Sequence, residues 1–224
     1  TAAYHTLCHS LIRRATGPIS ITPLCRDHFP YFTRERGPLE STDFSISRFL
    51  VPYLSGYQGF SLYLDSDMLA QVPINDIWHD TMPKATRKAV WVCPHDYTPK
   101  HSRKMDDQVQ TAYARKNWSS FMFFDNSECR VLTPDYVNTA TGLQLHRFEW
   151  LQDEQIGFLP LEWNWLVGEY ASNPEAKVLH YTLGGPWLPK YRDCDQSREW
   201  YAEYRSMTGM DYYPTQVWQQ PPLG

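Results

Sequence analysis

The sequence predicts an α/β fold in which helices flank a mostly parallel sheet. Short apolar runs that suit strands alternate along the chain with stretches of helical periodicity. The clearest run, 60–64, ends in two aspartates, Asp65 and Asp67, and ligands gather where strands end in open α/β sheets. The 224 residues, 42% of them hydrophobic, are enough for one large domain or for one domain with a small appendage.

Composition excludes several classes of protein. Charged residues make up 21% of the chain, which fits a folded domain, and the net charge of −4 gives no basic footprint for nucleic acid. No apolar run approaches the ~20 residues that a membrane span needs, and the start shows no signal peptide. The five cysteines are widely spaced without a CxxC pair, which argues against zinc and against a disulfide scaffold. We therefore expect a cytoplasmic protein without a membrane span or a nucleic-acid partner.

The first part of the chain is expected to hold two helices and two strands. Residues 3–15 repeat apolar side chains at helical spacing and end in two arginines, so we expect a helix there. Residues 19–24 alternate like a short strand, and cap residues precede a second helix at about 43–53. Arg48, in the middle of that apolar helix, needs a carboxylate or phosphate partner unless its charged end reaches solvent. The strand at 60–64 follows, and we expect it to be buried.

The rest of the chain continues the alternation of strands and helices. A helical turn is expected at 74–78, and a helix capped by Thr133 with proline as its first residue follows later. Further strands are expected at 88–94, 119–125, 156–161 and 177–181, and further helices at 143–151 and 195–208. An extended tail follows the last helix.

The pair Asp65 and Asp67 is the strongest chemical signal. Two carboxylates this close repel each other and lose hydration unless a cation lies between them, and their hard oxygens suit Mg²⁺ or Mn²⁺. The alternative is an acidic turn after a strand, since Asp and Ser favour turns. His180 ends a later strand before Gly184 and Gly185, whose small size would let backbone N–H groups approach a phosphate. A histidine before a turn is more often structural, but together with the aspartates it is a candidate third ligand that favours Mn²⁺.

The segments LYLDSDM and HYTLGGPW, in this order, resemble glycosyltransferase family 8. The resemblance implies a GT-A fold and transfer of a sugar, with retention, from a UDP- or GDP-sugar to an acceptor that the sequence does not identify. It also implies Mn²⁺ (or Mg²⁺) held by Asp65, Asp67 and His180. The catalytic domain would span residues 1–191, with 192–224 packed on it as a helix and an extended tail.

The same resemblance assigns roles to further residues. The donor-binding residues that it implies are Arg48, Ser66, Asn117, Gly184 and Lys190, and the catalytic ones are Asp153 and Glu154. The chain departs from the family pattern at Gly185, where a lysine is usual and for which Lys190 is the substitute, and at Glu154, which replaces a glutamine. Compared with the family pattern, we also expect the sequence to begin after the first strand of the family, and hence a sheet without that strand and weak nucleotide binding.

The sequence leaves open two alternative functions and the mechanism by which retention would occur. A sugar nucleotidyltransferase would also use paired aspartates and Mg²⁺, and a non-catalytic carbohydrate-binding relative would use the nine tryptophans and fifteen tyrosines. Retention is compatible with same-face attack, in which the leaving phosphate accepts the proton of the acceptor. It is also compatible with a carboxylate nucleophile, for which Glu154 or Asp153 is the candidate.

Overall fold

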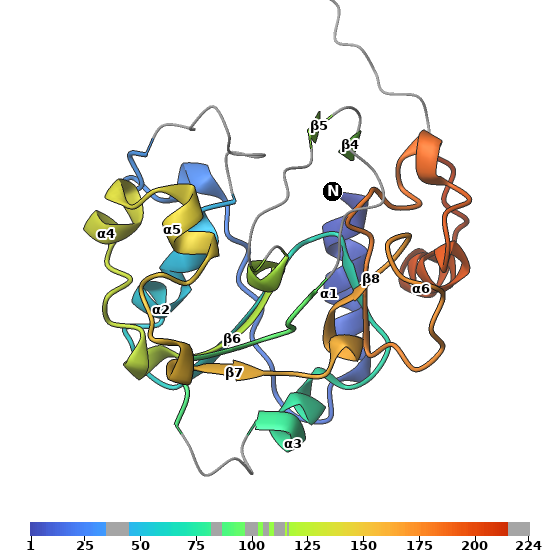
Figure 1. Cartoon of the computed structure of the whole chain (residues 1–224). Helices are drawn as coiled ribbons and strands as arrows, with labels where there is room; N and C mark the ends of the chain where they lie inside the picture. The colour runs from blue at the N-terminus through green and yellow to red at the C-terminus, as the bar shows by residue number, and fades with distance from the viewer. Residues whose placement is uncertain are drawn as a thin grey trace, which may run out of the picture.

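The computed structural model describes residues 1–34, 45–81, 87–96, 103–104, 108–109, 115 and 117–214. Strands lie between two groups of helices, α2, α4 and α5 on one side and α1 and α6 on the other, with α3 beyond one end (Figure 1). The helices are α1 (Ala2–Arg14), α2 (Val51–Leu54), α3 (Ile77–Thr81), α4 (Pro134–Thr139), α5 (Gly142–His146) and α6 (Ser197–Thr208). The expected α/β fold is confirmed.

The main sheet has four strands in the order β1-β6-β3-β7. These are β1 (Phe60–Leu64), β6 (Phe121–Asp125), β3 (Val90–Val92) and β7 (Ile156–Phe158). Strand β6 is antiparallel to both of its neighbours, and β3 and β7 are parallel. The expected predominance of parallel pairing is therefore wrong. Parallel neighbours need a crossover, usually helical, and the described residues between β3 and β6 contain no α-helix.

A second sheet, in the order β2-β9-β8, carries the histidine of the predicted site. Its strands are β2 (Met68–Ala70), β9 (Val178–His180) and β8 (Trp165–Leu166), and the hairpin β4 (Arg103–Lys104) with β5 (Gln108–Val109) is separate. Strand β9 is antiparallel to β2, with His180 opposite Met68, and parallel to β8. The chain therefore passes from the first sheet to the second in the turn that holds Asp65 and Asp67.

The residues of strand β6 are apolar except for the last because the strand packs against the core on both faces. Phe121 and Phe123 face a core cluster that includes Leu7 and Leu11 of α1, whereas Met122 and Phe124 face the cluster on the opposite side. All five residues of β6 are buried because both faces are covered. Strand β1 forms as predicted but is the edge strand of the described sheet, with Phe60 41% exposed, so the prediction that it is buried is wrong.

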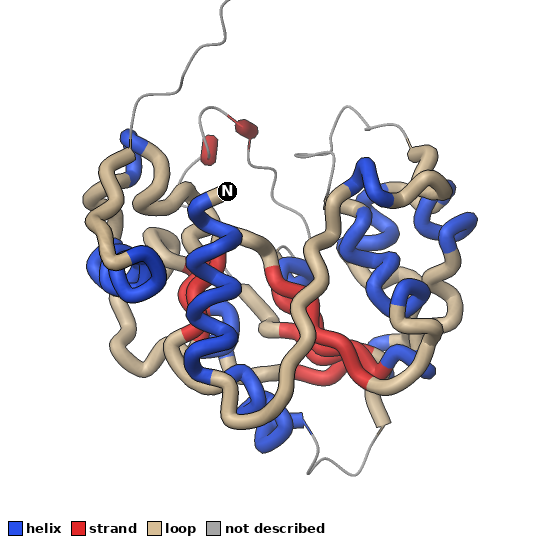
Figure 2. The backbone as a smooth tube through the Cα atoms, turned by 180° about the vertical axis from the view of Figure 1, so that it is seen from behind, coloured by secondary structure: helices blue, strands red, loops and turns tan. Residues whose placement is uncertain are grey.

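The strand expected at 19–24 does not form. These residues have no regular structure, and the loop after α1 crosses the strands as an irregular segment (Figure 2). Ile19 and Ile21 pack partly buried against the core cluster that contains Leu7 and Leu11. The alternation of apolar residues therefore reflects one-sided burial of two isoleucines and no strand pairing.

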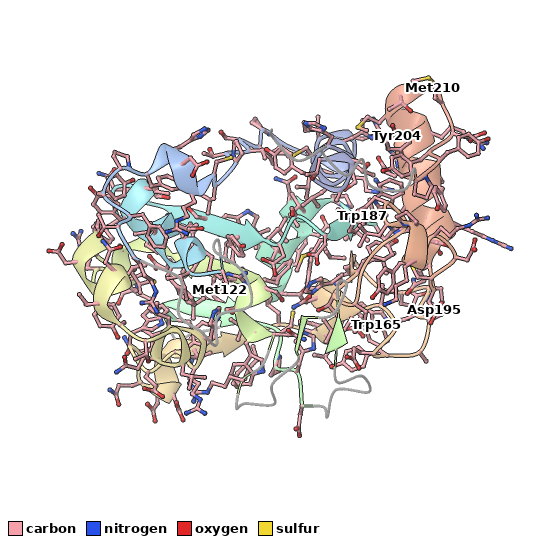
Figure 3. All side chains as sticks on the ribbon, turned by 90° about the horizontal axis from the view of Figure 1, so that it is seen from above. Met122, Trp165, Trp187, Asp195, Tyr204 and Met210 are labelled. Carbon is pink, nitrogen blue, oxygen red and sulfur yellow. The ribbon has the colours of Figure 1, made fainter. Side chains whose placement is uncertain are left out.

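Helix α6 packs through Trp200, which is 0% exposed, against Trp187 and Tyr212, and the Trp200 ring also stacks on Tyr204 of the same helix. Figure 3 labels Tyr204 on this helix and Trp187 near it. The division into 1–191 and 192–224 stays a prediction, and the end of the expected tail, 215–224, lies outside the described residues. Among the described helices, none is both long and apolar enough to cross a membrane.

Candidate active site

Asp65 is held by three neighbours at the end of β1. Its backbone N–H donates to Ser120 O (3.1 Å), which extends the β1–β6 pairing by one residue. Arg48 is 6% exposed, and its Nη2 lies 2.9 Å from Asp65 Oδ1 while its Nη1 donates to Ser119 O (2.8 Å). Tyr63 Oη donates to Asp65 Oδ1 (2.7 Å). Arg48, on a short 3-10 helix (Ser47–Leu50) just before α2, is thus buried and directed at Asp65, as its position among apolar residues predicts.

Tyr63 contacts both charged side chains, Asp65 and Arg48. Burial raises the pKa of the Tyr63 phenol well above its usual value, although the nearby Arg48 acts in the opposite direction. The phenol therefore keeps its proton and remains a donor to Asp65. The guanidinium carbon of Arg48 also lies 4.8 Å from the centre of the Tyr63 ring, within the range of a cation–π contact.

Asp67 and His180 complete a cluster with Asp65. One ligand atom from each of the three side chains lies within 4.8 Å of the other two. His180 Nε2 is 3.4 Å from Asp67 Oδ1, and His180 Nδ1 is 2.9 Å from Asn164 Oδ1. Two carboxylates and an imidazole form a donor set that fits Mn²⁺, since oxygen and nitrogen ligands of this kind are usual for that ion. The structure brings together the three residues that the sequence indicates as ligands.

Asp153 and Glu154 do not join this cluster. They directly precede β7, and the register places Ile156 beside Val90 and Val90 beside Phe124. Asp153 and Glu154 therefore lie at the end of the sheet where β1 begins, opposite to the end where β1 leads into Asp65. The Asp153 side chain is 77% exposed and pairs with Arg115 (2.6 Å), and the backbone carbonyl of Glu154 accepts a hydrogen bond from Lys88. A catalytic role for either carboxylate stays a prediction that this placement does not favour.

The predicted donor-binding residues are spread more widely. Ser66 is exposed between the two aspartates, and Asn117 precedes the short 3-10 helix Trp118–Ser120 next to the site. Gly184 N–H donates to Tyr181 O (2.9 Å), so the turn itself uses this group. A Cβ atom at Gly184 would approach the Tyr191 ring to 2.6 Å, so close packing explains the glycine without a phosphate. Lys190 is exposed, with Nζ 5.5 Å from the centre of the Tyr191 ring.

Several buried polar residues beside the site escape the sequence analysis. Asn164 is 0% exposed, and its only signal is a polar residue between two tryptophans. Burial and the nearby His180 lower the pKa of His95 to about 3, and its Nδ1 lies 2.9 Å from Tyr170 Oη. Burial, followed by the charge of Arg48, likewise lowers the pKa of His146 to about 3. Both imidazoles are therefore neutral near pH 7.

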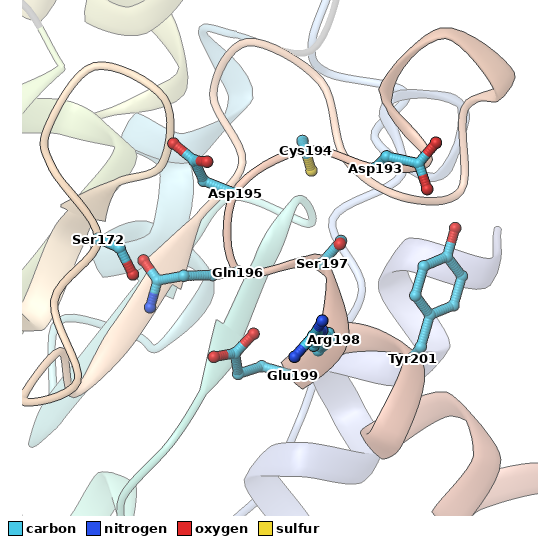
Figure 4. A pocket seen from close by; sticks show the side chains of 9 residues that line it. All are labelled: Ser172, Asp193, Cys194, Asp195, Gln196, Ser197, Arg198, Glu199 and Tyr201. Atoms are coloured by element: carbon cyan, nitrogen blue, oxygen red, sulfur yellow. The ribbon is translucent and has the colours of Figure 1, made fainter.

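An open pocket of about 510 Å³ lies elsewhere, beside the start of α6. The acidic side chains of Asp193, Asp195 and Glu199 surround it together with Ser172 (Figure 4). It contains none of the predicted site residues. The pocket is therefore separate from the Asp65–Asp67–His180 cluster.

Two solved glycosyltransferases have a similar fold. WbbM, a bifunctional glycosyltransferase, matches 91% of this chain with a TM-score of 0.59 and 12% identity, over 47% of its own length. GlyE of Streptococcus pneumoniae matches 91% of this chain with a TM-score of 0.54 and 13% identity, over 57% of its own length. The chain thus spans about half the length of these enzymes, and at such low identity the likeness shows the GT-A-like fold alone.

No protein-family model matches the chain. Its sequence is 42% identical to Protein CDI of Arabidopsis thaliana over 211 residues, which cover 90% of this chain and 80% of that protein. Identity at this level over nearly the whole chain requires the same fold and common descent. The chain therefore belongs to the family of Protein CDI.

Proposed function

We propose that the chain is a metal-dependent glycosyltransferase of the family 8 kind. It would move a sugar from a UDP- or GDP-sugar to an acceptor with retention of configuration. One observation carries the proposal: ligand atoms of Asp65, Asp67 and His180 lie within 4.8 Å of one another at the end of β1. The GT-A-like fold that the chain shares with WbbM and GlyE, both named as glycosyltransferases, supports it.

The chemistry of the leaving group explains why such a cluster is useful. A nucleoside diphosphate gains negative charge as the bond between the sugar carbon and the phosphate oxygen breaks. Mn²⁺ or Mg²⁺ bound to Asp65, Asp67 and His180 would supply the neutralising charge. Arg48 holds the Asp65 carboxylate in place through its 2.9 Å ion pair, so this ligand is oriented before the donor arrives.

The placement of Asp153 and Glu154 favours same-face attack. A double displacement needs a carboxylate beside the reacting sugar carbon, and the described sheet puts both residues at the opposite edge from Asp65. In same-face attack the acceptor oxygen bonds to the sugar carbon, and the bond from that carbon to the phosphate oxygen breaks. The acceptor proton passes to the departing phosphate. No protein nucleophile is then required.

Hydrolysis of nucleotide-sugars with and without Mn²⁺ tests the proposal. We expect the wild-type chain to release UDP or GDP from at least one of a panel of donors, and only when Mn²⁺ is present. Asp67→Asn should reduce this rate more than about 100-fold, beyond the 10- to 100-fold typical of changes outside the ligand shell. Asp125→Asn is the matched control because it makes the same change at an even more buried aspartate that lies at the far end of β6.

Other outcomes would support the competing functions. Exchange of pyrophosphate into a nucleoside triphosphate would identify a sugar nucleotidyltransferase. Sugar binding without any turnover would identify a carbohydrate-binding relative. Loss of turnover in Glu154→Gln with unchanged Mn²⁺ affinity would return that carboxylate to the mechanism and contradict same-face attack.

A further inference from the structure

A chain of buried hydrogen bonds runs from the backbone of Asn117 to the imidazole of His180. Ser120 Oγ donates to Asn117 O (2.7 Å), and Asn164 Nδ2 donates to Ser120 Oγ (2.9 Å). Asn164 Oδ1 in turn lies 2.9 Å from His180 Nδ1. Ser120, Asn164 and His180 are 3%, 0% and 2% exposed, so water does not compete for these bonds.

The donors and acceptors along this chain determine one another. A carbonyl oxygen only accepts, so the single hydroxyl proton of Ser120 is used toward Asn117 O. The Ser120 oxygen then accepts from the amide nitrogen of Asn164, which turns the amide oxygen toward His180. That oxygen also only accepts, so the proton of the neutral imidazole lies on Nδ1. Nε2 therefore carries a free lone pair.

We propose that Asn164 is a positioning residue that holds His180 in the Nδ1–H tautomer and so presents the Nε2 lone pair to a divalent cation. Nε2 is the imidazole atom that faces Asp67, 3.4 Å from Oδ1. Ligating histidines in general donate their other ring N–H to an acceptor, which determines the tautomer and orients the ring. The role of Asn164 belongs to the metal site of the proposed function and rests on that function only for the affinity measurement below.

A flipped amide is the competing arrangement. The Asn164 nitrogen would then donate to His180 Nδ1, and Nε2 would carry the proton and point it at Asp67. The Ser120 hydroxyl would have to turn toward Asn164 and lose its 2.7 Å hydrogen bond to Asn117 O. The two arrangements differ in the position of one imidazole proton, which is measurable.

Long-range ¹H–¹⁵N NMR spectra of the metal-free protein at about pH 8, above the ordinary histidine pKa near 6.5, report this position directly. We expect the Nδ1–H form in wild type and also in Asn164→Asp, because a carboxylate oxygen accepts the same hydrogen bond. In Asn164→Leu the Nε2–H form should grow. Calorimetric titration should show Mn²⁺ binding about 10- to 100-fold weaker in Asn164→Leu, and at least as tight as wild type in Asn164→Asp.

Asn126→Leu is the matched control. Asn126 is also 0% exposed and donates to Gln58 O and Ser61 Oγ, but it lies next to the start of β1, away from the cluster. This variant should lose stability and keep both the His180 tautomer and the Mn²⁺ affinity. If Asn164→Leu fails to fold, Ser120→Ala makes the same test, since it removes the hydroxyl that orients the amide.

Two results would overturn the role of Asn164. One is an Nε2–H tautomer in the wild-type protein. The other is a tautomer that does not change in Asn164→Leu, even if Mn²⁺ binding weakens, because the side chain would then act on packing alone. The tautomer is read without metal or nucleotide-sugar, so a chain that shows no sugar transfer would still decide the matter.

Discussion

At the scale of single residues, Arg48 is the side chain whose loss we expect to affect both the stability of the fold and the metal site. It brings a buried positive charge to Asp65 Oδ1 (2.9 Å) and Ser119 O (2.8 Å). A partly buried carboxylate loses much of its hydration, and the guanidinium compensates for that loss. A divalent cation at the same carboxylate would compensate for it too, so Arg48 and the metal act on one charge.

We therefore expect Arg48→Met to lower the free energy of unfolding by roughly 3 kcal/mol in the absence of metal, as is usual when one partner of a buried pair is removed. Added Mn²⁺ should restore part of the loss, so the rise in Tm on adding Mn²⁺ should be larger in Arg48→Met than in wild type. Arg48→Lys keeps the charge without the fork and should fall between them. Urea unfolding and thermal scans measure both quantities.

Arg87→Met is the control for this experiment. Its side chain is 66% exposed and pairs with Asp125 at the far end of β6, so its loss should change stability by about 0.5 kcal/mol or less. Equal Mn²⁺-induced shifts of Tm in wild type and Arg48→Met would mean that the ion does not reach Asp65.

The residues that could be predicted are those with a local signal. Asp65 and Asp67 follow strand β1 and His180 ends β9, which is a local signal for each, and the pairing of β2 with β9 brings them together. Asn164 could not be predicted because its role depends on Ser120 and His180, which other segments supply. The roles of Asp153 and Glu154 rest on resemblance alone, and the register of β7 puts these residues at the opposite end of the sheet from Asp65 and Asp67.

At the scale of elements, β7 packs against β3 through a glycine. A Cβ atom at Gly157 would lie 2.6 Å from Trp91 Nε1, and Trp91 is only 3% exposed. The ring fills the place of a side chain on the neighbouring strand. The close contact of these two strands therefore depends on residue 157 having no side chain.

Gly157→Ala should lower the free energy of unfolding by about 1–3 kcal/mol, because the buried indole must move or the strands must separate. Gly17→Ala is the matched control, since its nearest neighbour, Asn75 Nδ2, lies 3.8 Å from the added Cβ. Denaturant titration of both variants measures the difference. A Gly157→Ala protein as stable as Gly17→Ala would show that the Trp91 ring relaxes freely.

Elements that lie within a clear apolar run or a helical period are predictable from the sequence, and elements outside such a pattern are not. The helix at 3–15 and the strands at 60–64 and 119–125 have enough residues to show a period, and they form as α1, β1 and β6. Strands β2 and β8 have three and two residues and lie outside the apolar runs that predict strands. Strands β3, β7 and β9 also have three residues each, but they lie within such runs. Strands β2 and β8 exist because β9 supplies partners on both sides, which is a property of the fold and not of either segment.

At the scale of the whole molecule, one buried carboxylate joins the first helix to the last. Glu203 of α6 is 2% exposed and pairs with three side chains of α1: Arg13 (2.8 Å), Arg14 (2.6 Å) and His9 (2.6 Å). Burial alone would raise the pKa of Glu203, but the hydrogen bonds from Arg13 and Arg14 outweigh it and lower the pKa to about 2. The ionised form is the one that stabilises the fold.

Acid should therefore weaken the protein through Glu203. Its folded pKa is below its unfolded value of about 4.5, so the stabilisation is complete above pH 4.5 and is lost as the pH falls toward 2. The shift corresponds to about 3 kcal/mol. Glu203→Gln should lose this amount near pH 7 and should show a flatter stability profile between pH 4.5 and 2. Parallel slopes in both proteins would exclude Glu203 as the source.

The same contact bears on the order in which the chain is made. Glu203 follows its partners on α1 by 189 to 194 residues. At a synthesis rate of about 5–20 residues per second, roughly 10–40 seconds pass between the two. The arginines of α1 emerge from the ribosome before Glu203 and stay solvated during that interval. Strand β2 likewise cannot pair until β9 has been synthesised. Helix α1 is therefore synthesised well before α6 but is fixed in place only after α6 has been made.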